Sequence, residues 1–305
     1  RRRSPSRECR GHRTLGRKTM KTHTYAKLAM ATALGLSLAA PAVADPVDDK
    51  LVVDGMLELV TTTSAPDHLS DAFDTIYSGW HFRSDETRDL QRDDFDNPGM
   101  VFVDQALDSW NAVDGSAGQS CASCHDGPEA FEGLRAQMPR VDAKTGELTL
   151  MEEYINTCRT ERMGAEKWGW TSNPMKNMLA LISLQSRGMP VDVAIDGPAQ
   201  PYWEKGKEIY YTRYGQLEMS CANCHEDNYG RMIRADHLSQ GQINGFPVYR
   251  LKHAGILSAQ QRFKGCVRDT RAETFNPGSE EFKALELYVA SRGNGLSVEG
   301  VSVRH

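Results

Sequence analysis

"CASCH" occupies residues 121–125 and "CANCH" occupies residues 221–225, and the rest of the chain can be organised around these two motifs. In C-x-x-C-H the two thiols can form thioether bonds with the vinyl groups of haem, while the adjacent histidine reaches the iron. A disulfide or a zinc site can also use one such motif, but two copies favour haem. The sequence therefore predicts two covalently bound haem c groups, held by Cys121, Cys124 and His125 and by Cys221, Cys224 and His225.

The segments around the two motifs correspond to one another. A helical stretch headed by glycine precedes each motif, from Gly99 and from Gly206. A lone cysteine follows each, Cys158 and Cys266, and each half then continues with Asn-Pro and a helical pattern that ends in Ser-Arg-Gly. This common order predicts a mainly α fold of two tandem cytochrome c-like haem domains, related by internal duplication and with long irregular loops.

The same order suggests domain limits. We expect residues 1–44 to be an upstream extension and signal peptide, residues 45–197 the N-terminal cytochrome c domain, and residues 198–305 the C-terminal cytochrome c domain. The boundary is placed in "VDVAIDGPAQP", residues 191–201, because its Gly, Pro and Ala content is typical of a linker. Residues 45–98 lack a counterpart in the second half, and we expect them to wrap the first domain.

Residues 21–44 have the pattern of a secretory signal peptide. Two lysines precede a mostly apolar run at residues 28–40, and a small-x-small triplet ends at Ala44. We expect translation from Met20, cleavage after Ala44 and a soluble, exported protein in the periplasm. The apolar run is short for a membrane span.

The expected mature chain is acidic. Without residues 1–44 it has 26 Lys or Arg and 40 Asp or Glu, a net charge of −14, so nucleic acid is not an expected partner. The stretch from Arg231 to Arg271 has the opposite sign, with eight basic and two acidic side chains. A charge run is usually a solvated face, and haem propionates need cationic partners, but this concentration is also what would focus a small anion onto Cys266.

Each haem iron needs a sixth ligand or an open site. No histidine lies between His125 and His225, which leaves methionine or cysteine as the usual strong ligand of the first iron. Cys158 and Cys266 occupy corresponding positions of the repeat, and a thiolate is a strong ligand of haem iron. We assign His125 and Cys158 to the first iron and His225 and Cys266 to the second. The alternatives are a Cys158–Cys266 disulfide, a methionine ligand, or the histidines His237 and His253.

The two halves are not equivalent, because the basic surroundings of Cys266 have no counterpart at Cys158. A thiolate of low pKa among arginines is the usual setting of a reactive cysteine. The second haem is therefore the candidate active site. A sulfur on iron that faces an anion suggests sulfur chemistry.

With these residues in this order, the chain resembles a known family, the dihaem SoxA subunits of the SoxAX cytochromes of bacterial sulfur oxidation. The likeness covers essentially the mature chain and rests on the two haem motifs, Cys158 and "RFKGCVRDT" at residues 262–270. It implies an L-cysteine S-thiosulfotransferase that joins thiosulfate to a cysteine thiol of the carrier SoxYZ and passes two electrons to a cytochrome c. It also implies a heterodimer with the monohaem cytochrome SoxX, a catalytic Cys266 found as a persulfide, and an Arg262 that helps to hold the anionic substrate.

Two other functions fit the haem motifs alone. A dihaem electron carrier would have ordinary methionine or histidine ligation and no need for the basic stretch near Cys266. A dihaem peroxidase would have an open or readily opened iron.

Overall fold

The computed structural model describes residues 50–305. The expected signal peptide, its cleavage after Ala44 and the start at Met20 lie outside the described residues. Within residues 50–305, no helix combines the length and the apolar character needed to cross a membrane.

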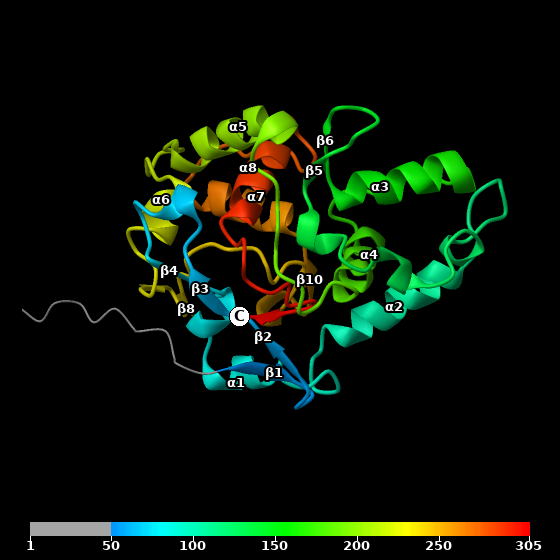
Figure 1. The fold of residues 1–305 in the computed structure, drawn as a ribbon, viewed down its shortest axis with the longest axis horizontal. Coiled ribbons are helices and arrows are strands. Elements are labelled where there is room, and N and C mark those ends of the chain that lie inside the picture. Colours follow the sequence, from blue (N-terminus) through cyan, green and yellow to red (C-terminus); the bar gives the residue numbers. More distant parts are fainter. Residues whose placement is uncertain (1–49) are drawn as a thin grey trace, which may run out of the picture. The chain divides into compact units, whose positions relative to one another are not determined.

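Helices are the main regular structure of the described chain, which confirms the prediction of a mainly α fold (Figure 1). The α-helices are α1 (Asp85–Asp89), α2 (Met100–Asn111), α3 (Met151–Thr157), α4 (Asn173–Leu184), α5 (Gln200–Tyr211), α6 (Cys221–His225), α7 (Ala259–Asp269) and α8 (Glu280–Ser291). Short 3-10 helices lie at Asp67–Leu69, Gly79–Phe82, Cys121–Ser123, Pro128–Phe131, Arg135–Gln137, Gly197–Ala199 and Leu251–His253. A π-helical segment, Cys158–Met163, directly continues α3.

The strands of the described chain are each two or three residues long. Antiparallel pairs join β1 (Leu51–Val53) to β2 (Leu57–Leu59), β3 (Thr62–Ser64) to β4 (Thr75–Tyr77), β5 (Arg140–Val141) to β6 (Leu148–Thr149), and β7 (Met232–Ile233) to β8 (Asp236–His237). In a three-stranded sheet, β9 (Val248–Arg250) lies between antiparallel β10 (Gly255–Leu257) and parallel β11 (Val303–Arg304). This sheet places Arg250 and Arg304 side by side in register.

The same local order precedes each cysteine motif. After α2 a β-bridge joins Asp114 to Gln119, and after α5 a β-bridge joins Tyr214 to Met219. A serine then caps each motif, and corresponding elements of the two halves lie 100 residues apart. Local structure in the two halves therefore follows one plan up to the haem motifs.

In each half the helix before the motif packs against the last helix of that half, α2 against α4 and α5 against α8 (Figure 1). The expectation that a glycine heads the second of these helices is wrong, because α5 begins at Gln200 and Gly206 lies inside it. A Cβ at position 206 would lie 2.1 Å from the carbonyl oxygen of Ala284 in α8. The glycine is needed for this close helix crossing, and its counterpart 100 residues earlier is the buried Ala106.

One hydrophobic core joins the two halves. Leu150 and Val191 of the first half pack in the same buried cluster as Phe282 of α8. The buried Arg135 donates its Nε–H to the carbonyl oxygen of Phe246 at 3.1 Å. The expected linker is thus held against the core at its start, since the backbone N–H of Val191 donates to the Leu296 carbonyl at 2.8 Å.

Residues 50–98 pack mainly against the second half, so the expectation that they wrap the first domain is wrong. Phe73 and Ile76 share a small core with Leu296, and the backbone N–H of Tyr77 donates to the side chain of Gln240 at 2.8 Å. Sequence position suggested the first domain because this segment precedes it. Its buried apolar side chains and backbone donors find their partners in the second half instead.

Candidate functional site

The two cysteine motifs are shaped by serine caps. Ser120 Oγ accepts the backbone N–H of Ser123 at 3.1 Å, and Ser220 Oγ accepts the backbone N–H of Asn223 at 3.3 Å. In return, the side chains of Ser123 and Asn223 accept the backbone N–H of the capping serines. Because this reciprocal cap fixes the first helical turn, the two thiols of each motif, three positions apart, lie on one side of it.

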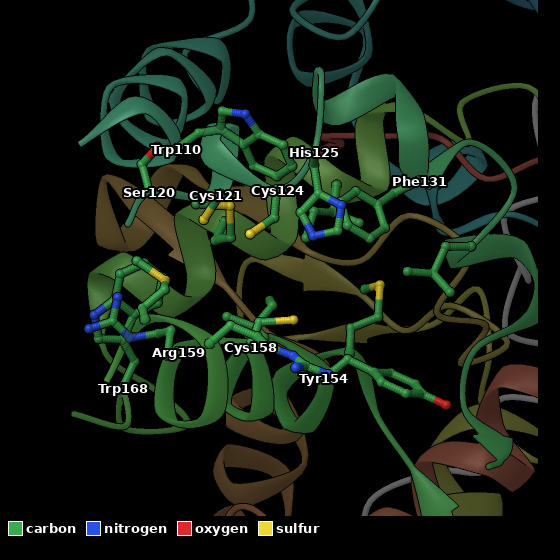
Figure 2. A pocket seen from close by; sticks show the side chains of 17 residues that line it. Trp110, Ser120, Cys121, Cys124, His125, Phe131, Tyr154, Cys158, Arg159 and Trp168 are labelled. Atoms are coloured by element: carbon green, nitrogen blue, oxygen red, sulfur yellow. The ribbon is translucent and has the colours of Figure 1, made fainter. Parts of the chain in front are cut away.

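The first motif borders a cavity of about 710 Å³, which we call the first pocket (Figure 2). Cys121, Cys124 and His125 lie on one side of it, and Cys158 lies across the gap at the start of the π-helical segment. The remaining walls are mainly apolar and aromatic, with Trp110, Phe131, Leu134, Met151, Tyr154, Ile155, Met163, Trp168, Met178 and Ile182.

Aromatic rings surround the histidine of the first pocket. The ring centroid of His125 lies 4.8 Å from that of Phe131 and 5.8 Å from that of Trp110. Among residues 50–305 the imidazole has no hydrogen-bond partner. Packing alone therefore orients this ring in the described chain.

The second pocket, of about 810 Å³, brings His225, Arg262 and Cys266 together. Arg262 and Cys266 both belong to α7 and lie one helical turn apart on the same face. Apolar walls come from Leu238, Ile243, Phe246, Val248, Leu257 and Phe263. Cys221 and Cys224 lie beside this site, because they share α6 with His225. Burial and then the charge of Cys266 raise the pKa of both thiols, that of Cys221 to about 12.

A backbone carbonyl orients the histidine of the second pocket. His225 Nδ1 lies 2.8 Å from the carbonyl oxygen of Ser239, and burial lowers the pKa of the imidazole to about 4. The ring is therefore neutral, with its proton on Nδ1 and its Nε2 lone pair free to bind a metal. Gly241 lies against the ring, since a Cβ at this position would be 2.9 Å from His225 Cγ.

Four arginines line the second pocket: Arg83, Arg250, Arg262 and Arg304. Only Arg250 and Arg262 come from the basic stretch that the sequence singled out, and the other six basic residues of that stretch do not line the pocket. Sequence analysis missed Arg83 and Arg304, because they belong to the segment before the repeat and to β11. No local pattern around either residue could have indicated the pocket.

The four arginines are engaged to different degrees. Arg83 pairs with Asp236, and Arg304 pairs with Glu299 at 2.6 Å. Within the described chain, the guanidinium of Arg262 has no hydrogen-bond or ion-pair partner. Burial, followed by the charges of Arg304, Arg262 and Arg250, lowers the pKa of Arg83 to about 9. The pocket therefore has a surplus of positive charge, with Arg262 free to bind an anion beside Cys266.

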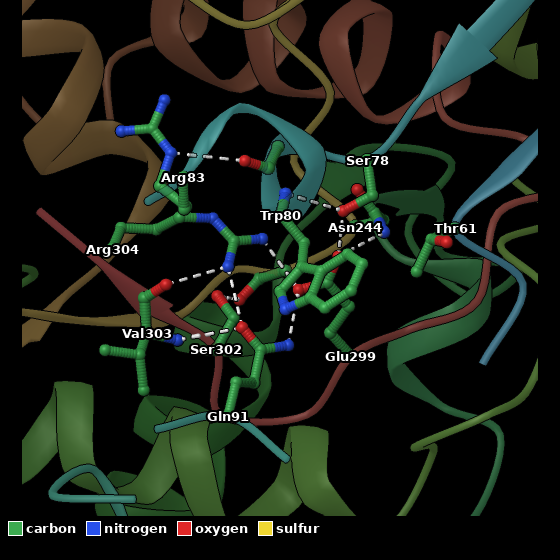
Figure 3. A network of polar contacts seen from close by, with 12 residues as sticks. Thr61, Ser78, Trp80, Arg83, Gln91, Asn244, Glu299, Ser302, Val303 and Arg304 are labelled. Carbon is green, nitrogen blue, oxygen red and sulfur yellow. Dashed lines mark hydrogen bonds and ion pairs between the residues drawn. The ribbon is translucent and has the colours of Figure 1, made fainter. Parts of the chain in front are cut away.

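A buried polar network around Glu299 supports this wall of the pocket (Figure 3). Glu299 accepts from Gln91 at 2.8 Å, from Arg304 at 2.6 Å and from the hydroxyl of Ser78. Burial alone would raise the pKa of Glu299, but Arg304 and these hydrogen bonds hold it below its usual value. Because the carboxylate stays charged, it ties together the N-terminal segment and β11.

The alternative ligands differ in their surroundings. His237 lines the second pocket, whereas His253 lies on an exposed 3-10 helix outside it. Met151, Met163 and Met178 line the first pocket. Each of the six cysteines of the described chain is free, and Cys158 and Cys266 lie in different pockets, which leaves no disulfide between them.

The residues of both sites fit haem c. Each site has a pair of thiols on one helical turn and an adjacent histidine, and this histidine and a later cysteine line one cavity that has apolar side chains in its walls. This donor set suits covalent attachment and axial ligation of haem, and the apolar walls suit its flat macrocycle. The surplus of arginines distinguishes the second site from the first.

Known proteins share these features. The SoxA/TsdA cytochrome c domain family matches residues 105–191 and again residues 205–298. The L-cysteine S-thiosulfotransferase subunit SoxA of Paracoccus pantotrophus is 73% identical over 287 residues, which cover 93% of this chain and 99% of that protein. The corresponding subunit of Rhodovulum sulfidophilum is 55% identical, with 94% of this chain and 100% of that protein covered.

A solved structure has the same fold. The crystal structure of SoxXA from P. pantotrophus contains a chain that superposes with a TM-score of 0.84 at 74% sequence identity. The alignment covers 86% of this chain and all of that chain.

Proposed function

The chain belongs to the SoxA/TsdA cytochrome c family, and from this premise we propose that it is the haem-bearing subunit of an L-cysteine S-thiosulfotransferase. The observation that carries the proposal is the second pocket, in which Cys266, Arg262 and His225 share one cavity with three further arginines. The names of the P. pantotrophus and R. sulfidophilum relatives point to the same activity.

We propose two haem c groups, one in each pocket. His125 and Cys158 would bind the first iron, and His225 and Cys266 would bind the second. The similar order of elements around residues 121–125 and 221–225 supports an internal duplication, with domain limits along the sequence at residues 45–197 and 198–305. Residues 50–98 precede the repeat and pack mainly against the second half. The two halves share one hydrophobic core.

The overall reaction joins two sulfur atoms. The thiol of a carrier cysteine and the terminal sulfur of thiosulfate form an S–S bond, the S–H bond of the thiol breaks, and one proton and two electrons are released. Haem, when bound, supplies the one-electron acceptor that passes these electrons to a cytochrome c. Charge balances, since a dianion and a neutral thiol give a monoanionic S-thiosulfonate, a proton and two electrons.

The residues of the second pocket have distinct tasks in this reaction. Arg262 binds the sulfonate oxygens of thiosulfate, because its guanidinium has no other partner in the described chain and lies one turn from Cys266. Cys266 provides the Sγ atom beside which thiosulfate binds. Arg250 adds positive charge from β9, with its Nε–H donated to the carbonyl of His305 at 2.6 Å. Arg83 and Arg304, each paired with a carboxylate, form the wall behind them.

Partners follow from the relatives. The similarity to the P. pantotrophus SoxXA structure supports a heterodimer with the monohaem cytochrome SoxX. The carrier would be SoxYZ, whose cysteine must reach the second pocket, and the complex would act in the periplasm.

Electron paramagnetic resonance of the oxidised protein tests the ligand assignment. We expect low-spin signals of haem with histidine and thiolate ligands. Signals of histidine and methionine ligation only would instead favour an electron carrier, and a high-spin signal from an open iron would favour a peroxidase.

The activity is tested with thiosulfate, reduced SoxYZ and oxidised cytochrome c, by mass spectrometry of the carrier. Wild-type protein should add thiosulfate to the carrier cysteine, and Cys266→Ala should lose this activity by roughly a thousand-fold or more. Cys158→Ala is the matched control and should keep most of it. A fully active Cys266→Ala protein with both haems attached would rule out the proposed role of Cys266.

A further inference from the structure

The carbonyl that orients His225 belongs to a small hairpin. The chain from His225 to Ser239 forms the β7–β8 hairpin, in which Met232 pairs with His237. Backbone hydrogen bonds from Gly230 N–H to the Leu238 carbonyl at 2.7 Å and from Leu238 N–H to the Arg231 carbonyl at 2.9 Å close it just before Ser239. The position of the Ser239 carbonyl therefore depends on the position of the hairpin.

Before the hairpin, Tyr229 packs against Phe73 and Phe82, but hydrophobic packing does little to hold the strands themselves. Its strand residues Met232 and Ile233 are 55% and 45% exposed. The strong tertiary contact comes from Arg83, which pairs with the carboxylate of Asp236 and donates to the carbonyl oxygen of His237 at 2.7 Å. The side chain of Arg83 is 6% exposed, so both interactions lie in a low-dielectric environment where they are strong.

The position of Arg83 is fixed by the 3-10 helix that precedes it. Arg83 follows the 3-10 helix Gly79–Phe82 and donates its Nε–H to the Gly79 carbonyl at 3.3 Å. Ser78 caps this helix by accepting the backbone N–H of Trp80 at 3.1 Å, and its hydroxyl donates to the buried Glu299 (Figure 3). The Glu299 network thus fixes the 3-10 helix to which the Arg83 side chain is hydrogen-bonded.

We propose that Arg83 is a positioning residue for the second iron site: it clamps the β7–β8 hairpin, and the hairpin in turn holds the Ser239 carbonyl against Nδ1 of His225. This inference rests on the proposed haem attachment at Cys221 and Cys224, with His225 as ligand, and not on the proposed reaction.

The clamp has a chemical consequence. A hydrogen bond from Nδ1–H to a carbonyl raises the electron donation of Nε2 and fixes the plane of the ring. His125 has no such bond in the described chain and is oriented by aromatic packing instead. The clamp therefore makes His225 the stronger donor of the two histidines and favours the ferric state at the second iron.

The test uses Arg83→Lys and Asp236→Asn in the full chain with both haems attached. Lysine keeps the charge but loses the fork that reaches Asp236 and His237 together, and asparagine keeps the shape but loses the charge. We expect one of the two haem reduction potentials to rise and its paramagnetic resonance signal to shift or split, while the other haem is unchanged. Gly241→Ala identifies the affected haem, because the added Cβ presses on His225 and should move the same signal.

Arg187→Lys is the matched control. Arg187 also ties the N-terminal segment down, through a 2.9 Å ion pair with Asp94, but it does not contact the hairpin. This variant should leave both potentials unchanged. The inference is overturned if folded Arg83→Lys and Asp236→Asn proteins keep both wild-type potentials and signals, or if both haems shift equally.

The melting temperature of each variant shows whether it is folded. If Arg83→Lys does not fold, the potentials and signals of Asp236→Asn alone test the inference. The outcome is separate from the proposed function, since potentials and spectra need neither thiosulfate nor carrier. A wild-type protein that forms no thiosulfate conjugate would overturn the function and leave this inference intact.

Discussion

The first and second pockets have the same arrangement of histidine and cysteine but differ in the other residues that line them. Both have a histidine on a capped turn and a cysteine from a later helix. Aromatic side chains dominate the first pocket, where Arg159 is already engaged by Asp114 at 2.7 Å and by the ring of Trp168 at 3.9 Å. Arg162 is the one other arginine among the residues that line it.

Part of the wall of the second pocket comes from outside the repeated elements, whereas Arg250 and Arg262 lie within the second half. Arg83 precedes the repeat and Arg304 lies on β11, after the last helix. Two sites with similar cysteine motifs can therefore differ in charge, because segments outside the repeat supply two of the four pocket arginines. The following experiments set matched positions of the two pockets against each other.

The largest difference is expected at two matched arginines. Arg262 precedes Cys266 by four residues, and Arg162 follows Cys158 by four. Arg262→Ala should lower kcat/KM for thiosulfate conjugation by about 100- to 1,000-fold, because an unpaired guanidinium that stabilises a bound anion is lost. Arg162→Ala should change it by less than about twofold. Equal losses in the two variants would contradict the assignment of the second pocket as the active site.

The next largest difference is expected in stability, at the crossing of α5 with α8 and at that of α2 with α4. Gly206→Ala should lower the free energy of unfolding by about 2–3 kcal/mol, because the new Cβ meets the Ala284 carbonyl, which the backbone of α8 cannot easily move. Ala106→Gly, at the matched position of α2, should cost about 1 kcal/mol through the flexibility of glycine alone. Denaturant unfolding measures both, and a Gly206→Ala protein as stable as wild type would show that the crossing is looser than described.

Glu299 should make stability depend on pH. Its pKa is lower in the folded chain than the ordinary value of 4.5, so its contribution is fully present above pH 4.5 and is lost as the pH falls through the folded pKa. Glu299→Gln should therefore be less stable than wild type by about 2 kcal/mol at pH 7, and this gap should close in acid. Asp114→Asn in the first half, whose carboxylate is exposed, is the control and should show a smaller gap at pH 7. A gap for Glu299→Gln that does not change with pH would argue against a charged carboxylate.

The smallest effect is expected at the basic residues that do not line the second pocket. Arg268 is exposed and pairs with Asp269 at 3.6 Å. Arg268→Ala should change kcat/KM by less than about twofold, and added salt should remove the difference. A loss as large as that of Arg262→Ala would mean that the whole basic stretch, and not the four pocket arginines, binds the substrate.

Local sequence was informative wherever function depends on neighbours in the chain. The caps at Ser120 and Ser220 and the helix that follows Ser279 depend on residues within one turn. The internal repeat pointed to Cys158 and Cys266, and each lines a pocket with the histidine of its own half. The error at Gly206 arose because a glycine in a helix has two explanations, a helix start and a close crossing, and only the packing of α8 distinguishes them.

The sequence by itself determined the haem motifs, the mainly α fold and the unequal charge of the two halves, because these depend on residue type and short spacing. The tertiary structure decided which arginines meet at Cys266 and where residues 50–98 pack. The contact between Arg83 and Asp236 joins positions 153 residues apart, and its geometry follows from burial and hydrogen bonding in the folded chain. No spacing rule along the chain contains that information.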